Sequence, residues 1–367
     1  MSPERERRYL VNMNHHKAQS LPQLVGPILV TGHSGFKGTW LTLLLEKLGT
    51  EVVGFSLPPE KDSLFDRAGR TGAIKEIFAD IRDYELVHSF TNAVRPSAII
   101  HMAAQPLVLE SYRRPKDTFD VNVMGTVNVL DSAFNCDSVQ AVIVVTTDKV
   151  YRNDNSGRAF IESDPLEGKD PYSASKVGTE AAVAAWQQIQ SISGGPKVVA
   201  VRAGNVIGGG DWGGNRLLPD LIRSFSSGQK MVVRNPASTR PWQHVLDPIS
   251  GYLSALEAVL NDEHLSSVNF GPDRQSIAVS EVVRIAVETW GLKTNIELDI
   301  SVPNSKSEAV SLDLNPNYAK NSLGWEPCWS QEEAVISTVQ WWDKVLNQGV
   351  TPIDACLDDI NQILSQK

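Results

Sequence analysis

A glycine-rich turn near the amino end constrains the fold of this chain more than any other feature. The apolar run Ile28 to Thr31 is followed at once by Gly32, Gly35 and Gly38, at the spacing GxxGxxG. An amphipathic helical pattern and a second apolar run come next. The order of strand, glycine turn, helix and strand predicts a βαβ unit, from which parallel sheets are built.

The same turn indicates a dinucleotide. Glycines let the backbone approach a pyrophosphate, and the following helix offers free N–H groups and positive potential. Glycines can also serve a simple tight turn, but here both flanks match the motif, so we expect a cofactor against this turn, with Phe36 beside it. The second strand ends at Phe55, Ser56 and Leu57 without an acidic residue for the adenosine ribose, which leaves NAD and NADP open. The absence of a nearby arginine cluster favours NAD.

Apolar runs and helical patterns alternate as far as Tyr151. This alternation predicts an α/β fold of the Rossmann type, a doubly wound parallel sheet, followed by a smaller C-terminal substrate-binding domain. Asp80 follows the third strand, where it could meet the adenine or could cap a turn. Small residues after the next strand would let a cofactor lie close. The candidate cofactor contacts at these strand ends are Asp80, Ile81, Ala103, Ala104, Gln105 and Asn122.

The stretch IVVTTDKVY, residues 143–151, carries the candidate chemistry. Its start is the continuous apolar run of a strand covered on both faces. Its end brings Thr147, Asp148 and Lys149 to the carboxyl end of the strand, where ligands bind in open α/β sheets. Alone, the stretch would equally fit a capped turn with a solvated lysine. Adjacent strand residues point to opposite faces, so both Asp148 and Lys149 can reach one ligand only if the chain leaves strand geometry there.

Tyr172 and Lys176 form a second catalytic candidate. They are four residues apart and therefore share one face of the helix expected over 177–190 and its approach. An ammonium beside a phenol lowers the phenol pKa, which would make Tyr172 a proton acceptor near neutral pH. Lys176 could also hold a ribose hydroxyl. The pair is common on ordinary helices and gains weight from the glycine turn upstream.

Composition excludes several classes of function. A net charge of −9 argues against nucleic acid as a ligand. The 3 cysteines have no metal-site spacing, so we expect no metal and reduced thiols. No apolar run approaches the roughly eighteen residues of a membrane span, and the amino-terminal segment is too polar for a signal peptide. We therefore expect a cytoplasmic protein with no membrane contact.

Four segments are expected along the chain. Residues 1–26 read as a mobile tail, and 27–201 as the dinucleotide-binding domain with the catalytic residues. Residues 202–348 are expected to be mainly substrate-binding, with about 240–262 as the part that could pack back on the first domain. Residues 349–367 read as a C-terminal tail without a functional signal.

The motifs TGHSGFKG at 31–38, the Thr147 region and YSASK at 172–176 resemble the extended short-chain dehydrogenase/reductase family. Within it, Thr-Asp-Lys at 147–149 is similar to the CDP-glucose 4,6-dehydratases, as are RAGNVIGGGDW at 202–212, NRLLPD at 215–220 and RNPASTRPWQHVLDP at 234–248. The likeness covers roughly residues 27–345. The glycine turn, the threonine and YSASK indicate the superfamily only, whereas the Asp-Lys pair and RPWQHV discriminate within it.

The resemblance implies an NAD-dependent dehydratase for deoxysugar biosynthesis, with CDP-glucose or a related nucleotide sugar as substrate. It implies that Tyr172 takes the proton of the sugar C4 hydroxyl while Thr147 contacts the same oxygen. We assign Asp148 as the acid and Lys149 as the base of water elimination, with Lys149 as a phosphate contact or solvated lysine as the alternative. A homo-oligomer, dimer or tetramer, is also implied.

Substrate contacts are expected mainly in the second half of the chain. Arg216 and Arg240 could grip the diphosphate or be surface ion-pair partners, and His244 could frame the substrate or be a core histidine. The candidate substrate contacts are Gln105, Asn205, Arg216, Leu217, Arg240 and His244. Leu109 and Glu110 stand where relatives often have basic residues, so specificity could differ. A C4 epimerase, a dehydratase for another nucleotide sugar, and a non-catalytic NAD sensor remain alternatives.

Overall fold

The fold is built on a seven-stranded parallel sheet. The computed structural model describes residues 21, 24–153, 156–228, 231–273, 275–291, 296–299 and 312–366, so the predicted tail over 1–26 lies almost wholly outside the described residues. The strand order is β12-β7-β5-β4-β1-β2-β3, all in parallel pairs. The strands are β1 (Ile28–Thr31), β2 (Val52–Ser56), β3 (Lys75–Phe78), β4 (Ala98–His101), β5 (Ala141–Val145), β7 (Lys197–Ala203) and β12 (Ser267–Phe270). This confirms the expected doubly wound α/β sheet.

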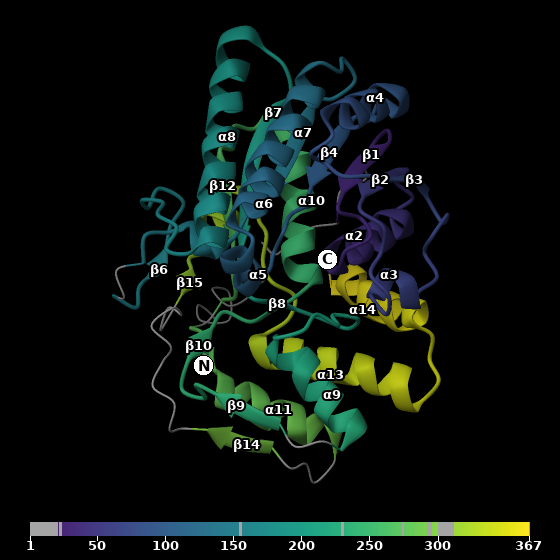
Figure 1. The fold of residues 1–367 in the computed structure, drawn as a ribbon, viewed down its shortest axis with the longest axis vertical. Coiled ribbons are helices and arrows are strands. Elements are labelled where there is room, and N and C mark those ends of the chain that lie inside the picture. Colours follow the sequence, from purple (N-terminus) through teal and green to yellow (C-terminus); the bar gives the residue numbers. More distant parts are fainter. Residues whose placement is uncertain are drawn as a thin grey trace, which may run out of the picture.

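Helices cover both faces of the sheet, which explains why its central strands β1, β4 and β5 are buried along their whole length. Along β5, Ile143 packs into one buried cluster, whereas Val142 and Val144 pack into the other. Helices α2 (Phe36–Lys47) and α10 (Leu246–Leu260) contribute to the first cluster. Helices α4 (Tyr84–Val94), α7 (Gly125–Phe134) and α8 (Pro171–Ser193) lie on the other face, where α8 and α7 stand side by side in Figure 1.

A smaller lobe lies beyond the carboxyl ends of the strands (Figure 1). It contains α9 (Leu217–Ser227), α11 (Val279–Trp290) and α13 (Gln331–Asn347), with the parallel strand pair β9 (Met231–Arg234) and β14 (Ile296–Asp299). The short strands are β6 (Ala159–Phe160), β8 (Val206–Ile207), β10 (Thr239–Arg240), β11 (Gln243–His244), β13 (Ile277–Ala278) and β15 (Asp313–Leu314). The remaining helices are α3 (Leu64–Arg67), α5 (Val108–Arg113), α6 (Pro115–Phe119), the π-helical turn Asp120–Met124, the 3-10 turn Asp148–Val150 and α12 (Asn317–Leu323). Strand β12 belongs to the main sheet and helix α10 packs against it, so elements from beyond residue 201 take part in the larger unit. The domain boundary after residue 201 therefore stays a prediction.

The C-terminal segment is a packed helix, although the sequence indicated only a tail. Helix α14 (Pro352–Gln366) buries Cys356, Ile360 and Ile363, which are spaced by four and three residues and so form one apolar face. This face joins the same buried cluster as α2 and α10. Among the described residues, no helix combines the length and the apolar character needed to cross a membrane.

Candidate active site

The glycine turn lies between β1 and β4, where the strand order reverses. Gly32 has a φ of +76°, and a Cβ built there would stand 2.7 Å from the backbone N of Ala103. A Cβ at Gly38 would stand 2.1 Å from the Gly32 carbonyl oxygen. A side chain at Gly32 would push the turn away from the segment after β4, and a side chain at Gly38 would push the start of α2 away from the turn itself. The glycines therefore keep the crevice at the switch point of the sheet, where open α/β folds bind their ligands.

The amino end of α2 fits an anion. Its N-cap residue is Gly35, which has no side chain to cap the helix, and the first turn holds no acidic residue. Ser34 does not fill the gap, because its hydroxyl bonds the Ser56 hydroxyl at 2.7 Å and donates to the Leu57 carbonyl at 2.9 Å. The free N–H groups of this turn thus remain for a pyrophosphate, as the dinucleotide hypothesis requires. Phe36 stands beside this turn, facing Gly208 of the second half of the chain.

The other candidate cofactor residues line the neighbouring strand ends. Asp80 binds Arg82 through both carboxylate oxygens, so the Arg82 guanidinium holds the pKa of Asp80 below its usual range. Ile81 is buried next to it against Gly125. Ala103 and Ala104 follow β4 as expected.

Asn122 and Gln105 bracket the segment after β4. The Asn122 amide accepts from the Gln105 backbone N–H at 2.8 Å, and it donates to the Gln105 carbonyl at 3.1 Å and to the Ser175 hydroxyl at 2.8 Å. The Gln105 side chain donates to the Thr118 hydroxyl at 2.9 Å. Asn122 lies in a π-helical turn, a distortion that often accompanies functional sites. It therefore ties the cofactor side of the sheet to the helix that carries Tyr172.

The catalytic turn leaves strand geometry, as the pairing of Asp148 with Lys149 requires. Strand β5 ends at Val145, and Asp148–Val150 forms a 3-10 turn whose N-cap, Thr147, accepts from the Lys149 backbone N–H. The Thr147 hydroxyl donates to the Asp148 carboxylate at 2.9 Å. Asp148 is buried, and burial raises the pKa of its carboxyl group. An acid that keeps its proton at higher pH is what water elimination needs.

Tyr172 and Lys176 lie together beside this turn, but they do not titrate as the sequence suggested. The Lys149 ammonium is 6.0 Å from the centre of the Tyr172 ring. Burial raises the pKa of Tyr172 to about 12, with Thr147 and Arg216 opposing the shift. Burial and the Lys37 cation lower the pKa of Lys176 to about 7, and its ammonium donates to the Val145 carbonyl at 3.1 Å. The lowering of the phenol pKa expected from the sequence is therefore not seen in this structure, because burial outweighs the groups that favour the phenolate.

Two residues at the site escaped the sequence reasoning. Lys37, inside the glycine motif, donates to the Tyr252 hydroxyl at 3.5 Å. Burial and Arg216 lower the pKa of Lys37 to about 8. A lysine within TGHSGFKG was a visible signal, whereas Tyr252 sits in an apolar stretch of α10 and gave none.

The arginines of the second lobe lie close enough to act on the catalytic residues. Arg216 donates to both carboxylate oxygens of Asp211 at 2.9 Å, and 37% of its side chain is exposed. It contributes to the pKa of Tyr172, as Arg240 does to that of Asp148. Leu217 begins α9 directly after Arg216, and the carbonyl of Asn205 accepts from the Gln243 backbone N–H at 3.0 Å. The structure thus brings Arg216, the N-cap residue of α9, and Arg240 of β10 towards the turn Asp148–Val150 from separate segments.

His244 requires a correction. It is completely buried, with the Trp329 ring tilted by 33° at 4.2 Å between ring centroids and the Trp40 ring edge-on at 5.9 Å. Its Nε2 atom lies 3.3 Å from the Asp359 carboxylate of α14. The structure therefore favours the core histidine over the substrate contact, because α13 and α14 close the space around it.

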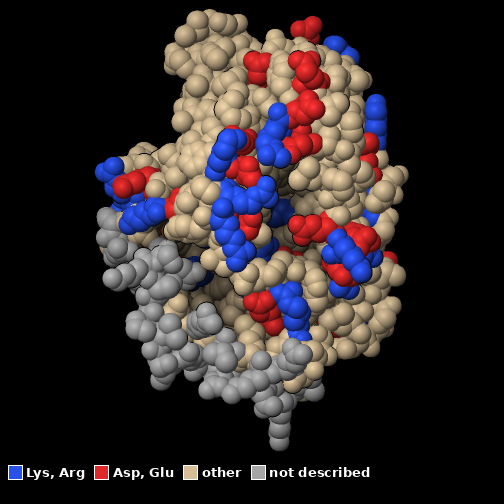
Figure 2. All heavy atoms as spheres, in the orientation of Figure 1, with Lys and Arg blue, Asp and Glu red and all other residues tan. Residues whose placement is uncertain are grey.

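Arg113 and Arg114, which follow the departure at Leu109 and Glu110, lie on the surface. Arg113 pairs with Glu110 at 3.7 Å and Arg114 pairs with Asp117, all on α5 and α6. Figure 2 shows acidic and basic side chains intermixed over these helices, without a field of one sign.

Fold and site together point to a dinucleotide-dependent enzyme, with the candidate catalytic groups at the carboxyl end of β5. Residues 28–271 match the model of the NAD dependent epimerase/dehydratase family. A CDP-glucose 4,6-dehydratase of Salmonella typhimurium is 39% identical over 86% of this chain and 89% of its own. A UDP-glucose 4-epimerase of Halalkalibacterium halodurans is 26% identical over 86% and 95%. The solved structure of DesIV, a dTDP-glucose 4,6-dehydratase of Streptomyces venezuelae with NAD and TYD bound, has a TM-score of 0.75 at 23% identity, covering 89% of this chain and 99% of that one.

The chain belongs to the NAD dependent epimerase/dehydratase family. This membership confirms the enzyme class and the NAD cofactor expected from the sequence. The roles of individual site residues stay predictions.

Proposed function

We propose that this protein is a CDP-glucose 4,6-dehydratase, which converts CDP-glucose to CDP-4-keto-6-deoxyglucose for deoxysugar biosynthesis. One observation carries the proposal beyond the family. Asp148 and Lys149 leave β5 on a short turn next to Tyr172, and the buried Asp148 has a raised pKa. The similarity to the Salmonella enzyme supports the same substrate.

The first step is oxidation at the sugar C4 atom. Tyr172 accepts the proton of the C4 hydroxyl, and Thr147 holds the same oxygen by a hydrogen bond. NAD, held against the Gly32 turn, would supply the hydride acceptor for C4 and the hydride donor for C6. With a Tyr172 pKa of about 12, only a small fraction of the phenol is ionised near neutral pH, and this phenolate is the form that accepts the proton. Lys176, next to it on α8, positions the cofactor ribose.

The second step is loss of water across C5 and C6. The C4 ketone acidifies the C5 proton, which Lys149 removes, while Asp148 protonates the departing C6 hydroxyl as water. The hydride then adds to C6 and a proton adds to C5. The sum is the loss of one water, with the cofactor restored. Both groups of the elimination step, the Asp148 carboxyl and the Lys149 amine, come from the single turn Asp148–Val150.

The second lobe binds the nucleotide sugar in this proposal, and residues 27–201 hold the cofactor and the catalytic groups. Arg216 and Arg240 bind the diphosphate, because a guanidinium can hold phosphate oxygens in pairs. Asn205 and Leu217 contact the substrate near them, and Gln105 contacts it from the cofactor side. We also infer a cytoplasmic homo-oligomer, a dimer or tetramer, which light scattering of the purified protein would test.

Incubation with CDP-glucose in deuterated water tests the function. We expect a 4-keto-6-deoxy sugar carrying deuterium at C5, seen by mass spectrometry and NMR. UDP-glucose and dTDP-glucose serve as matched controls and should react at least about tenfold more slowly. Turnover of one of these with CDP-glucose untouched would overturn the substrate assignment. A product of unchanged mass would indicate an epimerase, in line with the relatives of that activity.

A further inference from the structure

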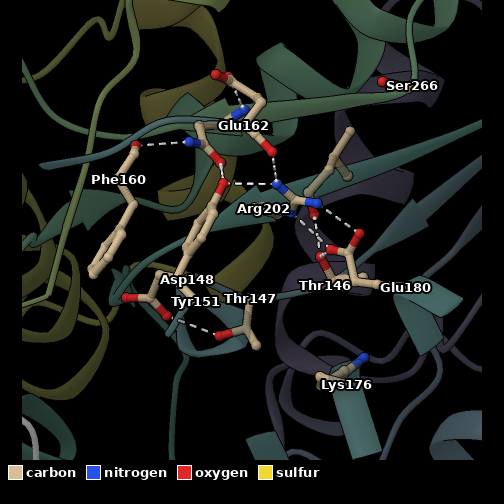
Figure 3. A network of polar contacts seen from close by, with 12 residues as sticks. Thr146, Thr147, Asp148, Tyr151, Phe160, Glu162, Lys176, Glu180, Arg202 and Ser266 are labelled. Carbon is tan, nitrogen blue, oxygen red and sulfur yellow. Dashed lines mark hydrogen bonds and ion pairs between the residues drawn. The ribbon is translucent and has the colours of Figure 1, made fainter. Parts of the chain in front are cut away.

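We propose that a buried polar network behind the catalytic turn positions its two ends separately, with Thr146 supporting C4 oxidation and Tyr151 supporting water elimination. The network runs through Glu180 and Arg202. This inference rests on the proposed dehydration, because it divides the two chemical steps of that reaction. Figure 3 shows the network directly behind Thr147 and Asp148.

The first end of the turn is tied to the catalytic helix. Thr146, which follows β5, donates its hydroxyl to the Glu180 carboxylate at 2.6 Å. Glu180 lies on α8, two turns beyond Tyr172. The position of Thr147, directly after Thr146, is therefore coupled to the helix that carries Tyr172. These are the groups that the proposal assigns to C4 oxidation.

The second end of the turn is tied to the neighbouring strands of the sheet. The Tyr151 hydroxyl accepts from Arg202 of β7 at 2.7 Å and donates to the Asn269 side chain of β12 at 2.7 Å. Its ring stacks on Phe160, with centroids 5.0 Å apart and planes 4° from parallel. Tyr151 directly follows Val150, the last residue of the turn. Its anchoring therefore holds the backbone that carries Asp148 and Lys149.

One ion pair joins the two ends. Arg202 and Glu180 meet through two hydrogen bonds of 2.8 and 2.9 Å, and each side chain is only 5% exposed. The remaining Arg202 donor reaches the Tyr151 hydroxyl and the Glu162 carbonyl. A guanidinium suits this place because its planar fork can serve Glu180 and Tyr151 together, which a lysine cannot do. A fully satisfied buried network of this kind holds its members in one geometry.

Tyr151→Phe and Thr146→Val test the division. Each substitution removes one hydroxyl and keeps most of the packing, so we expect both variants to fold. They are preferred to a substitution of Arg202, which would break the buried ion pair itself. The holoenzyme reacts once with CDP-glucose and is quenched at intervals. Mass spectrometry then separates the oxidised sugar that retains its C6 hydroxyl from the dehydrated product. Thermal melting and the rate of deuterium uptake at C5 are measured alongside.

In Tyr151→Phe, we expect the oxidised, hydrated sugar to accumulate, with elimination and deuterium uptake slowed roughly tenfold and oxidation changed less than about twofold. In Thr146→Val, oxidation should slow instead. Tyr84→Phe is the matched control. It removes a hydroxyl of α4 that donates to Asp131 of α7 at 2.7 Å, away from the site, so it should leave both rates unchanged.

Equal slowing of both steps, or no slowing of either, in Tyr151→Phe would overturn the inference, because the network would then contribute only to stability or to nothing measured. The unaltered protein serves as the separate check on the function. If it forms no dehydrated sugar, the proposed dehydration fails. If it does and Tyr151→Phe behaves like Tyr84→Phe, only the positioning fails.

Discussion

The catalytic turn and the substrate-side arginines are held in opposite ways. Behind the turn, Arg202 is 5% exposed, and each of its three guanidinium nitrogens donates to Glu180, to the Tyr151 hydroxyl or to the Glu162 carbonyl. Arg216, by contrast, is 37% exposed and its partner is Asp211, five residues away on the same loop. The Arg240 guanidinium donates to its neighbouring carbonyl at Thr239.

This difference in burial matches the different requirements of proton transfer and of substrate binding. Proton transfer needs groups placed within a fraction of an ångström, and a buried network anchored on strands supplies that. Diphosphate binding needs positive charge on long side chains. Connecting segments and short edge elements supply such side chains and tolerate sequence change. We therefore expect substitutions behind the turn to affect the stability of the fold or the rate of the chemical steps, and substitutions at Arg216 and Arg240 to affect mainly the substrate affinity.

The largest effect should come from Tyr172→Phe. The change removes the proposed proton acceptor without altering the packing, so turnover of CDP-glucose should fall by roughly 10²–10⁴-fold while the melting temperature hardly moves. Product formation followed by mass spectrometry measures this. Tyr84→Phe, with its hydroxyl on α4, is the control. Near-normal turnover in Tyr172→Phe would show that Tyr172 is not the proton acceptor. The contrast between catalytic groups and substrate-binding arginines would then lose its main catalytic residue.

Arg202→Met should have the next largest effect, and this effect should be on the stability of the fold. It leaves the buried Glu180 carboxylate without its counter-ion, which should lower the free energy of unfolding by about 3–5 kcal/mol in denaturant titrations. Arg284→Met is the control, because Arg284 makes ion pairs with Glu281 and Glu288 on the exposed face of α11 and should lose little. Similar losses in both would show that burial does not distinguish the two kinds of arginine.

Lys176→Met tests the burial of the catalytic region through pH. The lysine titrates at about 7 in the fold and near 10.4 when unfolded, so below pH 7 both states are charged and the fold bears the full cost of burying the charge. As pH rises from 7 to about 10, the folded lysine is neutral and this cost disappears. The substitution should therefore stabilise the nucleotide-free protein by a few kcal/mol at pH 6, and by progressively less towards pH 10.

Denaturant titrations at several pH values measure that trend. Lys116→Met is the control, because its ammonium is exposed and pairs with Asp120 on the surface at 2.6 Å. It should bring no gain at pH 6. A constant difference between Lys176→Met and the unaltered protein across this range would mean that Lys176 is not desolvated.

Arg216→Lys should have the smallest effect and the sharpest signature. A lysine keeps the charge but loses the planar fork, so KM for CDP-glucose should rise about tenfold with kcat changed less than about twofold. Steady-state kinetics at varied substrate concentration separate the two constants. A fall in kcat with KM unchanged would place Arg216 with the chemical groups and erase the contrast with Arg202.

Much of this site was predictable because its signals are local. The apolar run before Gly32, the helix after Gly38 and the spacing of Tyr172 from Lys176 each depend on near neighbours in the sequence. His244 was ambiguous for the opposite reason. Its surroundings, Trp40, Trp329 and Asp359, come from three distant segments, and no local pattern could tell a core histidine from a substrate contact. The C-terminal segment carries no functional motif and was expected to be a tail, although the helical spacing of Cys356, Ile360 and Ile363 was a local signal for α14.

The sequence by itself determined the order of strands and helices, the anion-binding turn at Gly32 and the set of polar groups at the end of β5. Only the tertiary structure decided how those groups titrate and what holds them. The Tyr172 pKa rises to about 12 and the Lys176 pKa falls to about 7. Burial, a property of the whole fold, is the largest cause of both shifts, and the four-residue spacing of the pair does not reveal it. The anchors of the catalytic turn, Glu180 and Arg202, likewise meet only when α8 packs on β7, since ion pairs between distant segments follow from topology and leave no local pattern.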